Sequence, residues 1–189
     1  MTDSAKDRAP ILAAGGIVLR EGSRPRIAIV RLRRDKSWVL PKGKLYRGEP
    51  ALAAAKREVL EETGHEVSVR EFLGSMSYPV DGKIKIIQFW RMHAVGPPVR
   101  QPTDDVKAVK WLSLKQAIDI LSREHEKVFL AHVGPIALKA ARESARDKIA
   151  KLSVRTRRKR AGRNAPAAPA EHLLAALKSM MPKARRLFG

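Results

Sequence analysis

The sequence predicts an α/β fold: an α/β/α sandwich around a mixed β-sheet, followed by a basic C-terminal extension. Segments rich in β-branched residues alternate with turns along residues 11–111, and helix-forming segments lie among and after them. This alternation is typical of helices packed on a sheet. Hydrophobic residues make up 44% of the 189 residues, enough for one packed core and an appendage.

Five segments are expected to form strands, namely residues 11–20, 26–34, 66–80, 83–95 and 106–111. The first two are joined by the turn EGSRP and are interpreted as a hairpin. The next two flank a tight turn at Asp81-Gly82. The last strand leads directly into an amphipathic segment that is expected to be helical up to Ser122.

An alanine-rich helix is expected between Pro50 and Gly64, because the intervening residues include neither proline nor glycine. Proline is favoured at a helix start and glycine just past a helix end. At about 100° per residue, one stripe of this helix is expected to be covered by the sheet. That stripe consists of Leu52, Ala55, Val59 and Thr63.

Three glutamates of the same helix, Glu58, Glu61 and Glu62, are spaced i, i+3 and i+4, so their carboxylates gather on another face. These like charges repel one another, and a hard divalent cation such as Mg²⁺ or Mn²⁺ would remove the repulsion. Arg57 and Glu49 are placed to form a charge-assisted tie between this helix and the loop before it.

Residues 43–64 read GKLYRGEPALAAAKREVLEETG and follow the pattern G-x5-E-x7-R-E-V-x-E-E-x-G. This pattern is similar to the Nudix box, and the chain resembles the Nudix hydrolases over roughly residues 11–133. The matching positions are Gly43, Glu49, Arg57, Glu58, Val59, Glu61, Glu62 and Gly64. One departure is His65, which stands where the family usually has an aliphatic residue. The resemblance implies the same sandwich architecture.

The resemblance also implies a chemistry for these residues. Glu58, Glu61 and Glu62 would be ligands of Mg²⁺ or Mn²⁺, and the main-chain carbonyl of Lys42 is a further candidate ligand. The cation would neutralise phosphate charge and lower the pKa of a bound water. Among the carboxylates, Glu58 is favoured as the base that takes the proton of the attacking water.

Basic residues near the glycine-bearing loop are the candidate phosphate contacts, by proximity and by charge. They are Lys42, Lys44, Arg31, Arg33 and Arg34. Asp104 or Asp105 would supply a further acid from a later loop, or else both are solvated turn residues.

The segment LPKGKLYRGE is similar to loops of dinucleoside polyphosphate hydrolases, of diphosphoinositol polyphosphate phosphohydrolases and of MutT-like enzymes. Together with the basic strand end at Arg31–Arg34, it favours hydrolysis of a dinucleoside polyphosphate or a diphosphoinositol polyphosphate. One alternative is MutT-like hydrolysis of oxidised deoxyguanosine triphosphate. The other is a non-catalytic Nudix-fold protein that binds a nucleotide or RNA.

Four parts are expected along the chain: a flexible N-terminus (1–10), a Nudix domain (11–134), a helical extension (135–154) and a basic linker with a candidate amphipathic helix (155–189). Residues 151–189 contain eleven Lys and Arg but one acidic residue, Glu171. This segment is either a solvated tail or an arm that binds nucleic acid or another anionic surface weakly.

Cysteine is absent, which excludes disulfides and thiolate zinc sites. No apolar segment reaches the length of a transmembrane helix. A cytoplasmic protein is therefore expected, and the resemblance implies that it acts on an anionic polyphosphate.

Overall fold

The computed structural model describes residues 9–20, 22 and 24–163. Along the chain, the elements are β1 (Ile11–Arg20), β2 (Arg26–Leu32), β3 (Trp38–Val39), β4 (Lys42–Lys44), α1 (Ala51–Thr63), β5 (Val67–Val80), β6 (Lys83–Ala94), β7 (Val106–Leu112), α2 (Leu114–Ile120) and α3 (Glu124–Arg163). All five expected strands, the helix after Pro50 and the helix before Ser122 are present, with ends shifted by a few residues. The expected helical extension begins earlier than residue 135, since α3 starts at Glu124.

The strands form a seven-stranded mixed sheet in the order β3-β2-β1-β6-β5, with β4 paired to β1 and β7 paired to β2. The predicted hairpin of β1 and β2 is confirmed, since Leu19 pairs with Ile27 in antiparallel register. Strands β1 and β6 run parallel, whereas the other neighbours are antiparallel. The short strand β4 therefore lies beside β1, and this pairing fixes the segment that leads into α1.

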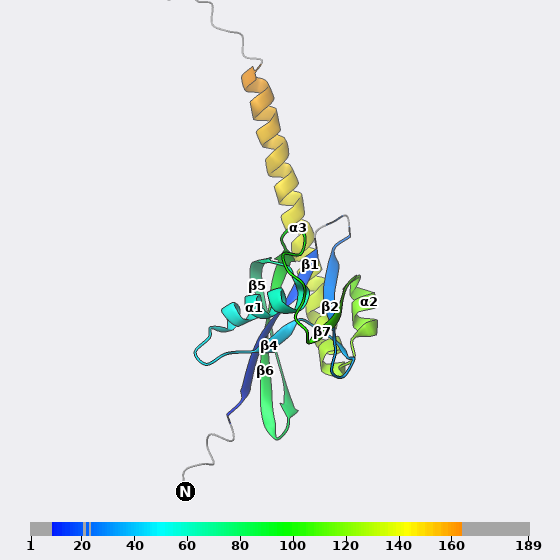
Figure 1. Ribbon diagram of the computed structural model, residues 1–189. Helices are drawn as coiled ribbons and strands as arrows, with labels where there is room; N and C mark the ends of the chain where they lie inside the picture. Colours follow the sequence, from blue (N-terminus) through cyan, green and yellow to red (C-terminus); the bar gives the residue numbers. More distant parts are fainter. Residues whose placement is uncertain (1–8, 21, 23, 164–189) are drawn as a thin grey trace, which may run out of the picture. The chain divides into compact units, whose positions relative to one another are not determined.

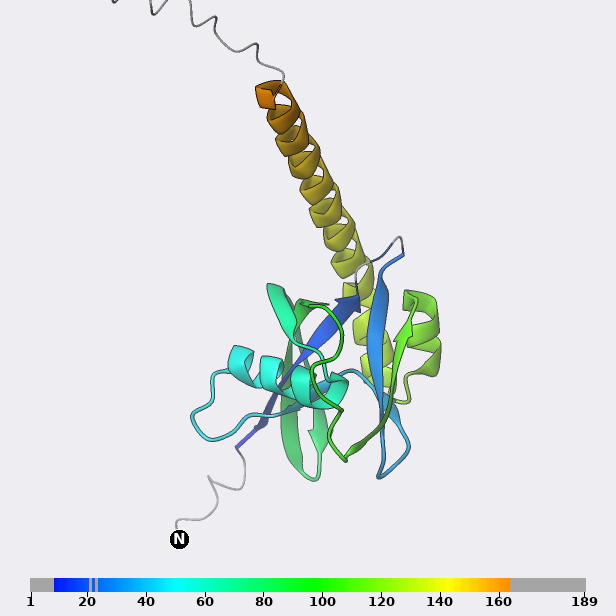
Figure 2. The same ribbon diagram turned by 45° about the horizontal axis from the view of Figure 1, so that its top comes forward.

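Helices cover both faces of the sheet, which confirms the predicted α/β/α sandwich (Figures 1 and 2). Side chains alternate along β1, so its residues enter two separate cores. Ala14 and Val18 pack with Val59 of α1 in one core. Ile17 packs on the opposite face in a core that includes Leu130 of α3.

Helix α1 has the predicted bounds, and Gly64 ends it in a left-handed conformation with φ of 75°. One prediction about its faces is wrong: Leu52 is 41% exposed, while Ala54 is buried instead. The buried face is rotated from the predicted stripe toward Glu58 and Glu62, both of which are partly buried. The helix therefore turns carboxylates, as well as its apolar residues, toward the rest of the domain.

Two further turns agree with their sequence signals. Asp81 and Gly82 both have positive φ, 50° and 73°, as the predicted tight turn between β5 and β6 requires. Ser113 caps α2, because its side-chain oxygen accepts the backbone N–H of Gln116. In turn, the side-chain oxygen of Gln116 accepts the backbone N–H of Ser113.

Helix α3 passes from one compact unit, which ends at Ser144, into a second that begins at Ala145. Within the first unit, Val133, Ala137 and Ala141 are buried. The first unit thus extends past the expected domain boundary at residue 134. Residues 155–163, expected in a linker, form the last turns of α3, since arginine and lysine are good helix formers.

The candidate amphipathic helix beyond residue 163 lies outside the described residues. Within the described part of the chain, no helix is both long enough and apolar enough to cross a membrane.

Candidate active site

The segment from β3 to β4 crosses close over β1 because β1 carries two consecutive glycines there. The backbone N–H of Gly16 donates to the Pro41 carbonyl at 3.1 Å. A Cβ on Gly15 would overlap that carbonyl. Gly43 likewise allows a close approach to α1, because a Cβ on Gly43 would overlap the carboxylate of Glu58. The glycine at this position therefore leaves the space that the Glu58 carboxylate occupies.

The predicted tie between helix and loop is confirmed: Arg57 and Glu49 form a bidentate ion pair. Arg57 Nε donates to Glu49 Oε1 at 2.9 Å, and Arg57 Nη2 donates to Glu49 Oε2 at 2.8 Å. The same guanidinium also donates to the Lys44 carbonyl at 3.1 Å and lies over the Tyr46 ring. Its hydrogen bond is the main reason that the pKa of Glu49 falls to about 2. These contacts fasten the loop to the first turns of α1.

Arg57 also connects two of the three predicted metal ligands. Its Nη1 donates to Glu58 Oε1 at 2.7 Å and to Glu61 Oε2 at 3.2 Å. Glu58 and Glu61 are only 14% and 29% exposed, respectively, so both charges lie in a partly desolvated environment. The positive charge of Arg57 partly offsets the repulsion between the two carboxylates that the i, i+3 spacing brings together.

The third carboxylate, Glu62, faces the β4 strand. Its Oε2 accepts the backbone N–H of Lys42 at 2.9 Å. Burial raises the pKa of Glu62 to about 8, and burial also raises the pKa of Glu58. Both carboxyl groups lie on one face of the helix. A cation bound there would favour their ionised forms.

The side chain of Lys42 points into the domain, away from solvent. Its Nζ lies 2.9 Å from Glu126 Oε1, and the ammonium and carboxylate side chains are 4% and 0% exposed. The ammonium also donates to the Leu40 carbonyl at 3.1 Å. The ammonium of Lys42 is thus paired inside the domain, whereas the main-chain carbonyl of the same residue stays a candidate ligand.

A basic cluster that the sequence did not indicate lies next to Lys42. Lys85 of β6 has its pKa lowered by burial, then by the charges of Lys42, Arg123 and Lys44. Tyr78 of β5 stacks on His125 at the start of α3, with ring centroids 3.8 Å apart. His125 is thus part of this region. Strand pairing and the α3 start bring these residues together, so sequence spacing gave no signal.

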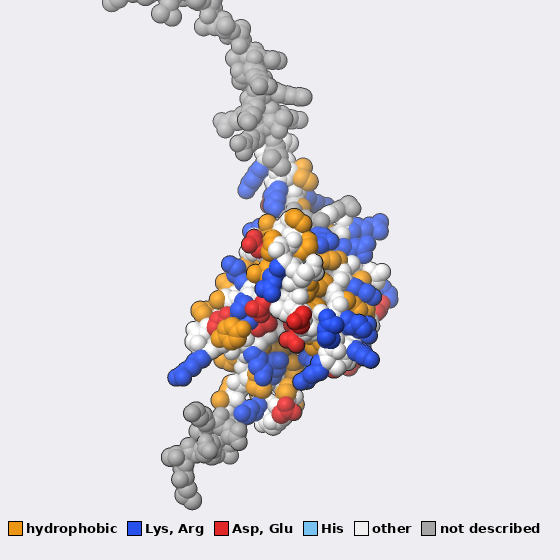
Figure 3. Space-filling view, in the orientation of Figure 1, with side chains coloured by type: hydrophobic (Ala, Val, Ile, Leu, Met, Phe, Trp, Pro, Cys, Tyr) orange, Lys and Arg blue, Asp and Glu red, His pale blue; other side chains and the backbone are white. Residues whose placement is uncertain are grey.

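The other predicted phosphate contacts, Arg31, Arg33 and Arg34, lie at the end of β2 and in the turn that follows it. Arg31 donates from Nε to the Lys36 carbonyl at 3.2 Å, within the β2–β3 turn. Arg33 donates from Nε to the main-chain carbonyl of Asp104 at 2.7 Å. Arg34 and Asp105 are exposed. Figure 3 shows Lys and Arg side chains gathered over the β2–β7 side of this face. The predicted roles of these residues stay predictions.

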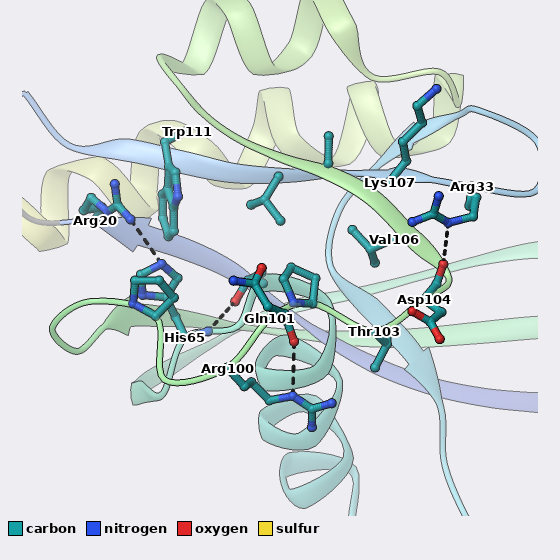
Figure 4. Close-up of a pocket in the computed structure, with 15 residues that line it drawn as sticks. Arg20, Arg33, His65, Arg100, Gln101, Thr103, Asp104, Val106, Lys107 and Trp111 are labelled. Atoms are coloured by element: carbon teal, nitrogen blue, oxygen red, sulfur yellow. Dashed lines mark hydrogen bonds between the residues drawn. The ribbon is translucent and has the colours of Figure 1, made fainter.

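A hollow of about 480 Å³ lies at the C-terminal end of α1 (Figure 4). Arg20, His65 and Trp111 lie together at one end of it, and Arg33 and Asp104 at the other. His65 is 2% exposed and contacts the Trp111 ring edge-on, so it fills the place of the expected aliphatic residue. The loop before β7 is connected to α1, because the Thr103 N–H donates to the Glu61 carbonyl at 2.8 Å.

The donor set of the α1 face suits a hard divalent cation. Carboxylate oxygens are the ligands that Mg²⁺ and Mn²⁺ prefer. Among the described residues, no three acidic, histidine or cysteine side chains converge on one point. Glu58 and Glu61 instead bond the Arg57 guanidinium. The carboxylates nevertheless fit the cation by the chemistry of their oxygens, and burial raises the pKa values of two of them, Glu58 and Glu62.

Comparison with known proteins identifies the family to which this region belongs. Residues 9–133 match the model of the family described as NUDIX domain. An 8-oxo-(d)GTP phosphatase of Mycolicibacterium smegmatis is 31% identical over 135 residues, which cover 66% of this chain and 42% of the relative. A bis(5'-nucleosyl)-tetraphosphatase [asymmetrical] of Rattus norvegicus is 31% identical over 98 residues, covering 49% of this chain and 67% of the relative.

Solved structures show the same fold. The C. elegans Ap4A hydrolase in a binary complex superposes with a TM-score of 0.61 at 23% identity, over 67% of this chain and 96% of that chain. The matched part of this chain spans only about half the length of the first two curated relatives, 42% and 51%.

Proposed function

The chain belongs to the NUDIX domain family, and on that premise we propose that it hydrolyses a phosphoanhydride bond in a nucleotide-linked polyphosphate. The observation that carries the proposal is the carboxylate-bearing face of α1. Glu58 and Glu62 are held there in partly buried positions beside the backbone of β4. A helix whose only task was to pack on the sheet would gain nothing from burying two acids that must lose their hydration.

Glu58, Glu61 and Glu62 would hold Mg²⁺ or Mn²⁺, with the Lys42 carbonyl as a further ligand. When bound, such a cation neutralises phosphate charge and makes a water acidic. Glu58 is the base in this proposal, because burial raises its pKa toward the range in which a carboxylate accepts protons effectively. Arg57 orients Glu58 through Nη1 and takes its own orientation from Glu49.

A dinucleoside polyphosphate is the first candidate substrate. Lys44, Lys85 and Arg123 contribute positive charge next to the β4 segment: burial lowers the pKa of Lys85 most, and the charges of Lys42, Arg123 and Lys44 lower it further. Several phosphates in a row would use such a cluster better than a single one. The stacked Tyr78 and His125 rings offer an aromatic surface for a base, which an inositol ring would not need. The rat relative carries the name of a tetraphosphatase acting on bis(5'-nucleosyl) compounds.

Oxidised deoxyguanosine triphosphate is the second candidate, because the M. smegmatis relative is named an 8-oxo-(d)GTP phosphatase. The test is a side-by-side kcat/KM measurement with Mg²⁺ on diadenosine tetraphosphate, a diphosphoinositol polyphosphate and 8-oxo-dGTP. We expect the highest value for the dinucleotide. A preference of tenfold or more for 8-oxo-dGTP reverses the order of the candidates. Absence of turnover on the whole panel, together with binding of any of these compounds, identifies the protein as a non-catalytic binder.

A further inference from the structure

Glu126 is the most deeply buried acidic side chain among the described residues, with 0% exposure. It lies in the first turns of α3, far in sequence from the α1 carboxylates. Its Oε2 accepts the backbone N–H of Leu40 at 2.7 Å, and its Oε1 lies 2.9 Å from Lys42 Nζ. One carboxylate thus holds Leu40, in the two-residue connection between β3 and β4, and Lys42, the first residue of β4.

The held segment bears directly on the α1 carboxylates. The Lys42 N–H donates to Glu62 Oε2 at 2.9 Å. Gly43, the next residue, lies against the Glu58 carboxylate so closely that a Cβ there would overlap it. A displacement of the Leu40–Lys42 backbone would therefore move both the donor that orients Glu62 and the surface that confines Glu58.

We infer that Glu126 is a positioning residue, which acts through Lys42 and Leu40 to set the orientation of Glu62 and the room left for Glu58. This inference rests on the proposed function, because it assigns Glu62 and Glu58 to the cation site. Groups that orient metal ligands from behind are commonly as important as the ligands themselves. Here the group comes from α3, so that helix completes the site from the far side of the sheet.

The energetics fit a retained positioning device better than a stabilising one. A buried ion pair loses hydration on both partners, and its replacement by apolar residues is often neutral or stabilising. Lys42 and Glu126 are both almost fully inside the domain, with Arg123 Nη1 at 3.7 Å from the same carboxylate oxygen. The contact is therefore poorly explained as a contribution to stability alone.

The experiment uses the full chain and measures Mn²⁺ binding by electron paramagnetic resonance, together with kcat, KM and Tm. In Glu126→Gln, the Leu40 N–H keeps an acceptor but the Lys42 ammonium loses its charged partner. We expect the Mn²⁺ dissociation constant to rise about tenfold and kcat to fall about tenfold, with KM within about twofold. Glu124→Gln is the matched control, since Glu124 lies on the same helix, is exposed and pairs with Lys127.

Because Glu126→Gln leaves a buried ammonium unpaired, it can fail to fold. The double variant Lys42→Met/Glu126→Leu removes both charges and fills the space with apolar side chains. If Glu126 positions the site, this variant keeps a Tm near that of the parent but binds Mn²⁺ at least about tenfold more weakly. Parent-like Mn²⁺ affinity and kcat in either folded variant overturns the inference. Failure of the parent itself to bind Mn²⁺ refutes the proposed cation site instead, so the two failures are distinguishable.

Discussion

At the scale of single residues, the α1 carboxylates illustrate how environment gives like groups different properties. Glu58 and Glu62 are turned inward and have raised pKa values, whereas Glu49 is turned toward Arg57 and has a lowered one. Desolvation is the largest cause of the raised pKa values of Glu58 and Glu62, and the hydrogen bond from Arg57 is the largest cause of the lowered pKa of Glu49. The sequence contains the same amino acid at all three positions, so only their placement separates the proposed cation ligands from the residue that ties the loop to α1.

We predict that Glu61→Gln and Glu62→Gln each lower kcat by at least about 10²-fold, the scale of losing a metal ligand or a positioned acid–base group. The amide keeps the size of the side chain but removes its charge. Steady-state kinetics with saturating Mg²⁺ measures the loss. Glu143→Gln, at an exposed position of α3, is the control and is expected to leave the rate unchanged. Near-parental rates in both site variants contradict the assigned roles.

Gly43→Ala is predicted to reduce kcat by about tenfold or more while changing Tm by only a few degrees. The new methyl group would occupy the position of the Glu58 carboxylate, and that flexible side-chain end has to move away. A small displacement of a reacting group is enough for a loss of this size. Gly22→Ala, where a Cβ would meet no atom closer than 3.9 Å, is the matched control. Equal activity of both variants would show that the Glu58 position is unimportant.

Glu71→Gln tests a pH-dependent ion pair away from the site. Arg91 is 4% exposed and donates to both Glu71 oxygens, and these hydrogen bonds lower the pKa of Glu71. A lowered pKa in the folded state contributes stability above the ordinary pKa, and this contribution is lost as the pH falls. Since Glu71 is 44% exposed, we expect a loss of only about 1 kcal/mol at pH 7, or a Tm lower by about 2–4 °C.

The difference in Tm between the parent and Glu71→Gln is expected to shrink as the pH is lowered from about 5 to about 3. Thermal denaturation followed by circular dichroism at several pH values measures it. The variant Glu66→Gln, at an exposed position just before β5, serves as the control. A difference that stays constant down to pH 3 means that the Glu71 charge is not the source of the effect.

At the scale of elements, the C-terminal end of α1 anchors the loop before β7. Val99 and Arg100 donate their N–H groups to the Gly64 carbonyl, at 2.8 and 3.4 Å, and Thr103 donates to the Glu61 carbonyl. The last carbonyls of a helix lack partners within the helix, so the loop satisfies groups that would otherwise need water. The loop and helix are consequently one unit in space although they are separated in sequence.

Gly64→Ala is predicted to destabilise the domain more than Gly82→Ala does. Both glycines have positive φ, 75° and 73°, so both substitutions carry the same backbone strain. At Gly64 a Cβ would in addition overlap the Arg100 carbonyl, whereas at Gly82 it would meet no atom within 4 Å. We expect a Tm difference of several degrees between the two variants by calorimetry. Equal losses would show that the loop yields without cost.

At the scale of the whole molecule, the positive charge is divided unevenly between the sandwich and the C-terminal segment. Residues 151–189 hold eleven of the 39 Lys and Arg residues. The residues of the predicted site all lie before Ser144, within the first compact unit. Catalysis and any binding through the basic segment are therefore predicted to be separable.

Truncation after residue 154 is expected to leave hydrolysis of a small substrate within a few-fold of the parent. It is also expected to abolish salt-sensitive retention on RNA or DNA, because that retention depends on release of counterions by clustered basic residues. Kinetics and salt-gradient elution from an immobilised nucleic acid measure the two effects. Loss of turnover on truncation contradicts the separation, and retention that persists assigns nucleic-acid binding to the sandwich.

Features that are local along the chain could be predicted from the amino-acid sequence alone. The loop–helix–glycine pattern predicted the bounds of α1, the Glu49–Arg57 tie and the spacing of the glutamates, because each depends on neighbours within one or two turns. Alternating strands likewise predicted the sandwich, since a sheet with apolar faces needs helices to cover them. The prediction that Leu52 is buried was wrong, because the buried face of a helix depends on what the helix packs against.

The distant groups around the proposed site, in contrast, depend on how separate segments pack together. Lys42 looked like a phosphate contact from its place beside the loop, yet its ammonium pairs with Glu126, 84 positions later in the sequence. Lys85 and the Tyr78–His125 stack join the same region through the register of β5 and β6 and the start of α3. No periodicity along the chain encodes such contacts, because they arise when strand order and helix packing place separate segments side by side. Local spacing thus specified the carboxylates, and packing specified their surroundings.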